Sequence, residues 1–310
     1  MRRVHSFGQI SLSLCACLRR EEVRYRDCVV SLDSVPQLAA GFTCGEVRGG
    51  NGIVHEVVRL PGLRGMLYSR PCSGANGGDI HYLSVCGSGL LARVCLADVA
   101  GHGPTIAAVS SEMHAHLRRS VDVIDERRVL GRLDQRLESK GLRAMTTAVL
   151  ATYYPPQRRL TVSYAGHPPG WLYRAREDRW ESLYVVRPPL APPAFVDLPL
   201  GTGLAPTYTR HRFRVSPGDR MLLITDGVLE TTSPDDIPFD THGITALLEA
   251  KTGTYAHLAD QLLRALHAHA ATDHLSHDDV SFLLVEFVEG PAGPALWHVI
   301  KNRLLQRVIR

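Results

Sequence analysis

Four aspartates in this sequence lie where apolar runs begin or end, each beside glycine or another turn-forming residue. They stand in the phrases Gly77-Gly78-Asp79, Asp98-Val99-Ala100-Gly101, Asp226-Gly227 and His277-Asp278-Asp279. A carboxylate at the end of a buried strand is costly unless something compensates its charge. One such aspartate is commonly a cap or a turn residue, but four of them indicate carboxylates that converge on a cation.

The ligand types indicate which cation. Carboxylates without cysteine or histidine beside them favour Mg²⁺ or Mn²⁺ over zinc. Three or four carboxylates can hold two such ions close together, and such a pair activates water for an in-line displacement at phosphorus. We therefore expect a phosphate ester as substrate, because a carboxylate cluster without metal would repel its charge.

The composition is that of a globular protein. The chain has 310 residues, of which 45% are hydrophobic and 21% charged. The formal net charge of +4 is too small to indicate nucleic-acid binding. No apolar stretch approaches the roughly 20 residues that a membrane span requires. The short apolar run of residues 10–18 is followed at once by Arg19-Arg20-Glu21-Glu22, so we expect no signal peptide.

All seven cysteines lie in the first third of the chain, at positions Cys15, Cys17, Cys28, Cys44, Cys72, Cys86 and Cys95. Their odd number and their spacing do not fit a small disulfide scaffold. A zinc site made of the first four would lack the C-x2-C spacing that such sites favour. We expect free, reduced thiols, which are typical of a cytoplasmic protein.

Hydrophobic periodicity predicts runs of strands interrupted by pairs of helices. Strands are expected at 66–69, 81–86, 90–97, 146–154, 160–165, 171–174, 179–186, 213–215, 221–225 and 280–286, and helices at 103–119, 126–140, 244–251 and 255–270. Single helices do not alternate with single strands, which argues against a doubly wound parallel sheet. The pattern favours an α+β fold in which two antiparallel sheets pack together between helix pairs, a four-layer αββα sandwich.

Three regions are expected along the chain. Residues 1–64 are predicted to be an extension of uncertain structure, and residues 65–288 the folded domain. Residues 289–310 are predicted to be a basic amphipathic tail, which either contacts a membrane or partner or, as we favour, docks on its own domain. The proline-rich stretch 188–206 is expected to be a mobile loop.

The ordered phrases of the chain resemble those of the PPM-type metal-dependent serine/threonine protein phosphatases, in their stage-two sporulation protein E-like branch. The phrases are Arg70-Pro71-Cys72-Ser73-Gly74-Ala75-Asn76-Gly77-Gly78-Asp79, Asp98-Val99-Ala100-Gly101-His102-Gly103, Met145-Thr146-Thr147-Ala148, Ala165-Gly166-His167-Pro168-Pro169, Leu198-Pro199-Leu200-Gly201, Thr225-Asp226-Gly227 and His277-Asp278-Asp279-Val280-Ser281. Each phrase alone is weak evidence, but all of them in this order are strong. The resemblance covers about residues 65 to 288.

This resemblance implies roles for individual residues. Asp98 would bridge two metal ions with help from the Val99 carbonyl, and Asp79 would bind one ion directly or through water. Asp226 and Asp278 would complete the other ion's ligands. The nucleophile would be water held by the metal. The substrate would be a phosphoserine or phosphothreonine of a signalling protein, usually an anti-sigma-factor antagonist in a bacterial partner-switching pathway.

Other candidate residues keep two interpretations each. His102 either donates a proton to the leaving oxygen or orders the turn before a helix. Arg70 either binds the substrate phosphate or is a surface arginine. His167 either lines the site or makes a structural hydrogen bond. Asp279 is expected to point to the face opposite Asp278, as strand alternation predicts.

One departure from the family concerns position 82. Many relatives have a second acidic residue three positions after the Gly-Gly-Asp aspartate, whereas this chain has Tyr82. The tyrosine supports an alternative function, a weak or inactive phosphatase-fold module that binds signalling partners. A third interpretation, a two-metal phosphodiesterase or nucleotidase, lacks a histidine-rich metal signature and a nucleotide-binding loop.

Overall fold

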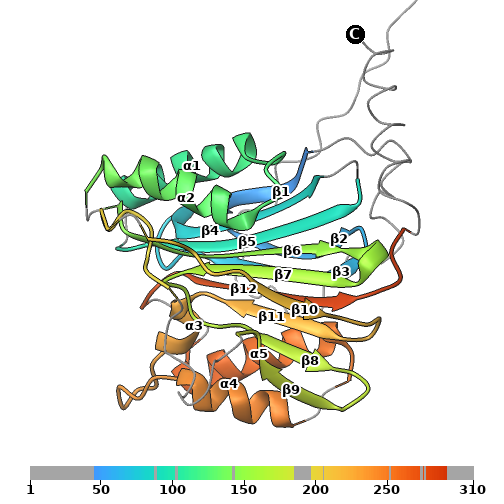
Figure 1. Ribbon diagram of the computed structural model, residues 1–310. Coiled ribbons are helices and arrows are strands. Elements are labelled where there is room, and N and C mark those ends of the chain that lie inside the picture. The colour runs from blue at the N-terminus through green and yellow to red at the C-terminus, as the bar shows by residue number, and fades with distance from the viewer. Residues whose placement is uncertain are drawn as a thin grey trace, which may run out of the picture. The chain divides into compact units, whose positions relative to one another are not determined.

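The computed structural model describes residues 45–86, 89–101, 104–141, 144–184, 197–204, 206–250, 253–272, 275 and 277–291. Within them, two antiparallel sheets of six strands each pack face to face, and helices cover both outer faces (Figure 1). This arrangement confirms the predicted α+β fold with two helix-flanked sheets. His102, residues 1–44, residues 185–196 of the proline-rich stretch and residues 292–310 of the predicted tail lie outside the described residues.

Sheet A has the strand order β1 (Gly45–Gly52), β4 (Asn76–Cys86), β5 (Leu91–Val99), β6 (Thr146–Tyr154), β7 (Arg159–Ala165) and β10 (His211–Arg214). Sheet B has the order β2 (Val54–Leu60), β3 (Leu63–Arg70), β12 (Val280–Phe287), β11 (Arg220–Ile224), β8 (Trp171–Arg174) and β9 (Arg179–Ser182). Strands β5 and β12 are buried at every position. They read as continuous apolar runs because both faces of a central strand are covered in a four-layer sandwich.

Two helix pairs cover the sheets: α1 (Pro104–Arg119) and α2 (Glu126–Glu138) on sheet A, and α4 (Asp240–Glu249) and α5 (Tyr255–Ala270) on sheet B (Figure 1). Two shorter elements, η2 (Pro155–Gln157) and α3 (Asp226–Glu230), lie between strands. Helix α2 starts where the carboxylate of Asp125 accepts the Arg127 N–H, and α5 where the Thr254 hydroxyl accepts the His257 N–H. These caps satisfy backbone donors that the first helical turn leaves free.

The two sheets include residues before residue 65, where the folded domain was predicted to begin. Strands β1 and β2 form one edge of each sheet, although both belong to the segment predicted to be an extension. The apolar pattern missed β1 because four of its eight residues are glycine. The glycines are needed here, since a Cβ at Gly49 would collide with the ring of His114 on α1, and Gly50 has a φ of 149°.

The described end of the proline-rich stretch is held by hydrogen bonds. Leu200 and Thr146 exchange two backbone hydrogen bonds of 2.8 and 3.1 Å, and the Gly201 N–H donates to Asp134 at 2.8 Å. In the part of the chain that the structure covers, Cys72, Cys86 and Cys95 are free thiols. No helix among the described residues is both long and apolar enough to cross a membrane.

Candidate metal centre

The four aspartates come together from both sheets. Asp79 on β4 and Asp98 on β5 are neighbours on adjacent strands of sheet A, because each lies one position beyond the paired residues Ile80 and Ala97. Asp226 is the first residue of α3, directly after β11 of sheet B, and Asp278 lies two residues before β12. Electrostatic repulsion acts on Asp98 from both Asp226 and Asp278, which places the sheet B carboxylates close to those of sheet A.

Burial and mutual repulsion both disfavour the charged form of the carboxyl groups in this cluster. The side chains of Asp79 and Asp98 are only 2% and 8% exposed. Burial raises the pKa of both carboxyls well above the ordinary range, and repulsion between neighbouring carboxylates raises each further. Burial, then Glu230, likewise raises the pKa of Asp226. For Asp79, hydrogen bonds with Ser281 and Thr225 act in the opposite direction and lower the pKa.

The donor set fits hard divalent cations. Asp79 accepts the Thr225 hydroxyl on Oδ2 at 2.9 Å, but its buried Oδ1 has no hydrogen-bond partner. A buried oxygen left in this state costs about 1–3 kcal/mol unless a cation or water satisfies it. Clustered carboxylate oxygens are the ligands that Mg²⁺ and Mn²⁺ prefer. The chemistry of this donor set therefore fits Mg²⁺ or Mn²⁺.

The Val99 carbonyl lies beside the Asp98 carboxylate. A Cβ placed on Gly78 would lie 2.8 Å from the Val99 carbonyl oxygen and 3.1 Å from Asp98 Oδ1. Only glycine lets β4 approach the end of β5 this closely. Gly227, in α3, likewise permits a close backbone approach next to sheet B, because a Cβ there would overlap the Asp279 backbone. The glycines of the motifs thus permit the close packing that brings the carboxylates together.

Asp279 does not point away from the site as strand alternation suggested. It is 3% exposed, and its carboxylate accepts the backbone N–H groups of Cys72 at 2.7 Å, of Gly78, and of Asp79 at 3.3 Å. Alternation fails here because β12 begins only at Val280. Asp279 therefore fixes the start of β4 and the backbone of Asp79. In the sequence, the signal for such an acceptor was the Gly-Gly-Asp phrase, because the backbone N–H groups of its residues need acceptors when they are buried.

The thiol of Cys72 lies near the same carboxylates. One ligand atom from each of Cys72, Asp278 and Asp279 falls within 4.8 Å of the others. Burial, followed by a hydrogen bond to Asp279, raises the pKa of the Cys72 thiol. Asp279 is already occupied by backbone donors, so this trio does not form a separate site with free ligands.

Thr225 and His167 tie the two sheets together next to the carboxylates. The Thr225 hydroxyl donates to Asp79 and accepts the Ser281 N–H at 3.0 Å. His167 is fully buried, with Nδ1 2.9 Å from the Thr147 hydroxyl and Nε2 2.8 Å from the Ile224 carbonyl. Both ring nitrogens are therefore occupied by protein groups. His167 thus makes the structural hydrogen bonds of its second interpretation and has no nitrogen left to bind substrate.

Arg70 lies at the edge of the carboxylate cluster, whereas Tyr82 lies away from it. Arg70 is the last residue of β3, half-buried and opposite Val280 in the ladder with β12, so it lies at the edge of the cluster. Tyr82 is 1% exposed and packs beneath α1 in the core between sheet A and its helices. Asp79 faces sheet B instead. Side chains three positions apart on a strand lie on opposite faces, so residue 82 is not placed to share a metal with Asp79.

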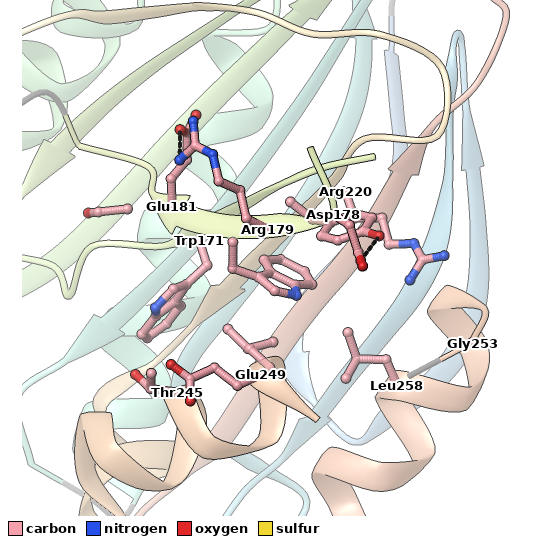
Figure 2. Close-up of a pocket in the computed structure, with 13 residues that line it drawn as sticks. Trp171, Asp178, Arg179, Glu181, Arg220, Thr245, Glu249, Gly253 and Leu258 are labelled. Atoms are coloured by element: carbon pink, nitrogen blue, oxygen red, sulfur yellow. Dashed lines mark hydrogen bonds and ion pairs between the residues drawn. The ribbon is translucent and has the colours of Figure 1, made fainter. Parts of the chain in front are cut away.

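A cavity lies elsewhere, between the β8–β9 hairpin and helices α4 and α5 (Figure 2). Its volume is about 670 Å³, and its walls include Trp171, Trp180 and Arg220. Arg220 is paired with Glu286 at 3.3 Å. None of the four aspartates lines this cavity. This cavity is therefore separate from the carboxylate centre.

Comparison with known proteins gives the same architecture. Among solved structures, the chain is similar to the PP2C domain of SiaA from Pseudomonas aeruginosa, with a TM-score of 0.59, 19% identity, and coverage of 71% of this chain and 85% of that chain. It is similar to the RsbU and RsbW domains of a Mycobacterium tuberculosis protein, with a TM-score of 0.58, 21% identity, and coverage of 77% and 64%. For RsbX in complex with magnesium, the TM-score is 0.55 at 17% identity, with coverage of 76% and 100%.

Identities this low show the shared fold alone. No curated protein sequence matches the chain. The family described as stage II sporulation protein E (SpoIIE) matches residues 91–288, which is more than half of the chain. That match includes three of the four clustered aspartates. The chain therefore belongs to the stage II sporulation protein E family and has the PP2C-type phosphatase fold.

Proposed function

We propose that this protein is a metal-dependent phosphatase that removes phosphate from serine or threonine of a phosphorylated partner protein. The observation that carries the proposal is the buried carboxylate cluster at the junction of the two sheets, where burial and neighbouring carboxylates raise the pKa of Asp79, Asp98 and Asp226. A cluster of this kind destabilises a fold unless it binds cations, so a purely structural role does not explain it.

Two Mn²⁺ or Mg²⁺ ions would be held by Asp79, Asp98, the Val99 carbonyl, Asp226 and Asp278. When bound, such ions lower the pKa of water for attack at phosphorus and offset the charge of the phosphate oxygens. The protein's own contribution is to hold its ligands in place before the ions arrive. Asp279 fixes the backbone around Asp79, and Thr225 orients the carboxylate.

Two residues are proposed to act on the substrate itself. Arg70, at the edge of the cluster, would bind phosphate oxygens through its guanidinium. His102 follows β5 in the Asp98-Val99-Ala100-Gly101-His102 phrase and would donate a proton to the departing serine or threonine oxygen. The role of His102 remains a prediction from sequence, because this residue lies outside the described part of the chain.

The expected partner is a phosphorylated signalling protein of a bacterial partner-switching pathway, and an anti-sigma-factor antagonist is the proposed substrate. Support comes from the family and from similarity to proteins named RsbX, RsbU and RsbW. We propose a cytoplasmic location on the same grounds. The alternative of an inactive scaffold loses one of its supports, since Tyr82 lies on the face of β4 opposite Asp79.

A metal titration tests the proposal. Hydrolysis of p-nitrophenyl phosphate and of candidate phosphopeptides is measured against Mn²⁺ and Mg²⁺ concentration, while calorimetry measures metal binding independently. We expect metal-dependent hydrolysis that Asp226→Asn abolishes and that Asp235→Asn leaves intact, since Asp235 is exposed in the loop before α4. Full activity in excess chelator would exclude the metal mechanism. Metal binding without hydrolysis of any phosphopeptide would instead favour the scaffold.

A further inference from the structure

A second cluster of like charge lies on sheet A, where β7 pairs with the edge strand β10. A hollow of about 260 Å³ opens there, lined by Gln157, Arg158, Arg159, Arg212, Phe213 and Arg214. Four of these six residues are arginine, and no acidic residue belongs to the lining. We call this feature the arginine hollow.

The strand register forces two of these arginines together. Arg214 is directly opposite Arg159 in the ladder between β10 and β7, and Arg212 lies two residues away on the same face. That face is the outer one, because the intervening Leu160 is buried between the two sheets. Like charges directly opposite each other destabilise a sheet. The arrangement therefore favours an anion that would lie between these side chains.

Among the described residues, only one arginine of the hollow has an anionic partner from the protein. Arg158 is paired with Glu289 at 3.1 Å. In the described part of the chain, Arg159, Arg212 and Arg214 form no ion pair, and all three are exposed. The guanidinium of Arg159 lies 5.8 Å from the centre of the Tyr154 ring, a cation–π contact that leaves its charge uncompensated.

Apolar groups adjoin the hollow and indicate the kind of anion. A neighbouring recess of about 120 Å³ shares Arg159 and Arg212 with the hollow and is also lined by Ile124, Leu91 and Tyr154. The one acidic residue of that recess, Glu126, is buried and paired with Arg210 at 2.8 Å. The side chain of Ile124 is among the exposed large hydrophobic residues, at 61%. A surface that offers guanidinium groups beside an isoleucine suits a peptide in which carboxylates and apolar residues are interleaved. A nucleic acid would need a longer basic surface, and the net charge of only +4 does not provide one.

We propose that the arginine hollow docks an acidic, leucine- or isoleucine-containing segment of a partner protein. Arginine suits this role because its planar fork can bind a carboxylate through two hydrogen bonds. The hollow is remote from the carboxylate centre. Tyr154 and Asp98 lie at opposite ends of the paired strands β5 and β6, and the seven residues from Ala92 to Asp98, six steps along the strand, span about 20 Å. Docking there would hold a partner without blocking the metal site.

The test measures binding of a fluorescein-labelled peptide with alternating glutamate and leucine pairs by fluorescence anisotropy. The protein carries Arg212→Glu and Arg214→Glu together, and the matched control carries Arg132→Glu and Arg136→Glu on the exposed face of α2. Both double variants change the net charge equally. We expect at least about a tenfold loss of affinity at the hollow and less than about a twofold loss in the control, with wild-type binding weakened by 0.5 M NaCl.

Several outcomes would overturn the proposal. An equal loss in both double variants would mean a general charge effect, and no binding of the peptide at low salt would exclude an acidic docking segment. Preferential binding of single-stranded RNA or of phosphatidylserine vesicles would assign the hollow to another partner. Arg212→Lys guards against misfolding, because it keeps the charge but loses the two-hydrogen-bond fork and should therefore bind more weakly than the wild type but more tightly than the double glutamate variant. Since binding is read without catalysis, failure here is separate from failure of the proposed phosphatase activity.

Discussion

The carboxylate centre and the arginine hollow both gather like charges at an end of sheet A, but they differ in burial. Asp79 and Asp98 are 2% and 8% exposed, and repulsion between them adds to the cost of burial. The arginines of the hollow are exposed, and water and salt screen them. From this difference we expect a bound cation to stabilise the fold at the buried cluster, whereas a bound anion at the exposed cluster would have little effect on stability.

The largest expected effect is at the buried cluster. Asp98→Asn should lower metal-dependent hydrolysis on the order of a thousandfold, the equivalent of several kcal/mol of lost electrostatic stabilisation. In chelator, the same variant should have a higher melting temperature than the wild type, because it removes a buried charge. Phosphatase kinetics and differential scanning calorimetry check the two parts. A lower melting temperature in chelator would contradict our account of the cluster.

The next effect concerns how Asp79 is held. Thr225→Val removes the hydroxyl that donates to Asp79 Oδ2 and should weaken Mn²⁺ binding by about 10–100-fold. Thr225→Ser keeps the hydroxyl and serves as the matched control. Isothermal titration with Mn²⁺ distinguishes the two. If both variants bind the metal like the wild type, Thr225 contributes only to packing.

The pH dependence of the free energy of unfolding tests the cost of burying His167, which is neutral in the folded protein. Burial lowers the pKa of His167 to about 4 from an ordinary value of 6.5. The unfolded chain therefore takes up a proton that the folded chain refuses, so stability is complete above pH 6.5 and falls as pH decreases towards 4. At pH 5 the loss is about 2 kcal/mol. Urea unfolding at pH 7.5 and 5, in chelator, should show a smaller loss for His167→Gln; an unchanged loss would argue against this assignment.

The smallest effect is expected at the hollow. Arg214→Glu replaces a repulsive cross-strand pair with an attractive one opposite Arg159 and should raise the free energy of unfolding by up to about 1 kcal/mol. Arg214→Gln, which only removes charge, should fall between this variant and the wild type. Urea denaturation at low and high salt measures the series. A destabilised Arg214→Glu variant would show that the arginines are not in repulsive contact.

The sequence predicted the secondary-structure elements and the convergence of the aspartates better than it predicted the residues that hold those aspartates in place. Helices α2 and α5 follow from apolar spacing, and the strand-end aspartates follow from their glycine neighbours. Asp279 was misplaced because its orientation depends on where β12 begins. The inter-sheet bond from Thr225 to Asp79 depends on how two sheets pack, which local patterns do not encode.

The register between paired strands is the other property that could not be predicted from the sequence. Arg159 and Arg214 lie far apart along the chain, and only the pairing of β7 with β10 makes them neighbours. The glycine-rich strand β1 was missed for a local reason, since its residues lack the alternation by which strands are recognised. Long-range pairing and close backbone approach thus account for most of what the sequence analysis left out.

The position of β12 has a consequence for synthesis. This strand lies between β3 and β11 in sheet B, and Asp278 and Asp279 precede it directly. A ribosome releases the chain from its N-terminus, so β3 and β11 emerge long before the strand that joins them. Until then the nascent chain has an open sheet and an incomplete set of ligands. Sheet B is therefore completed, and Asp278 and Asp279 become available to the carboxylate cluster, only after the other described strands of both sheets have been synthesised.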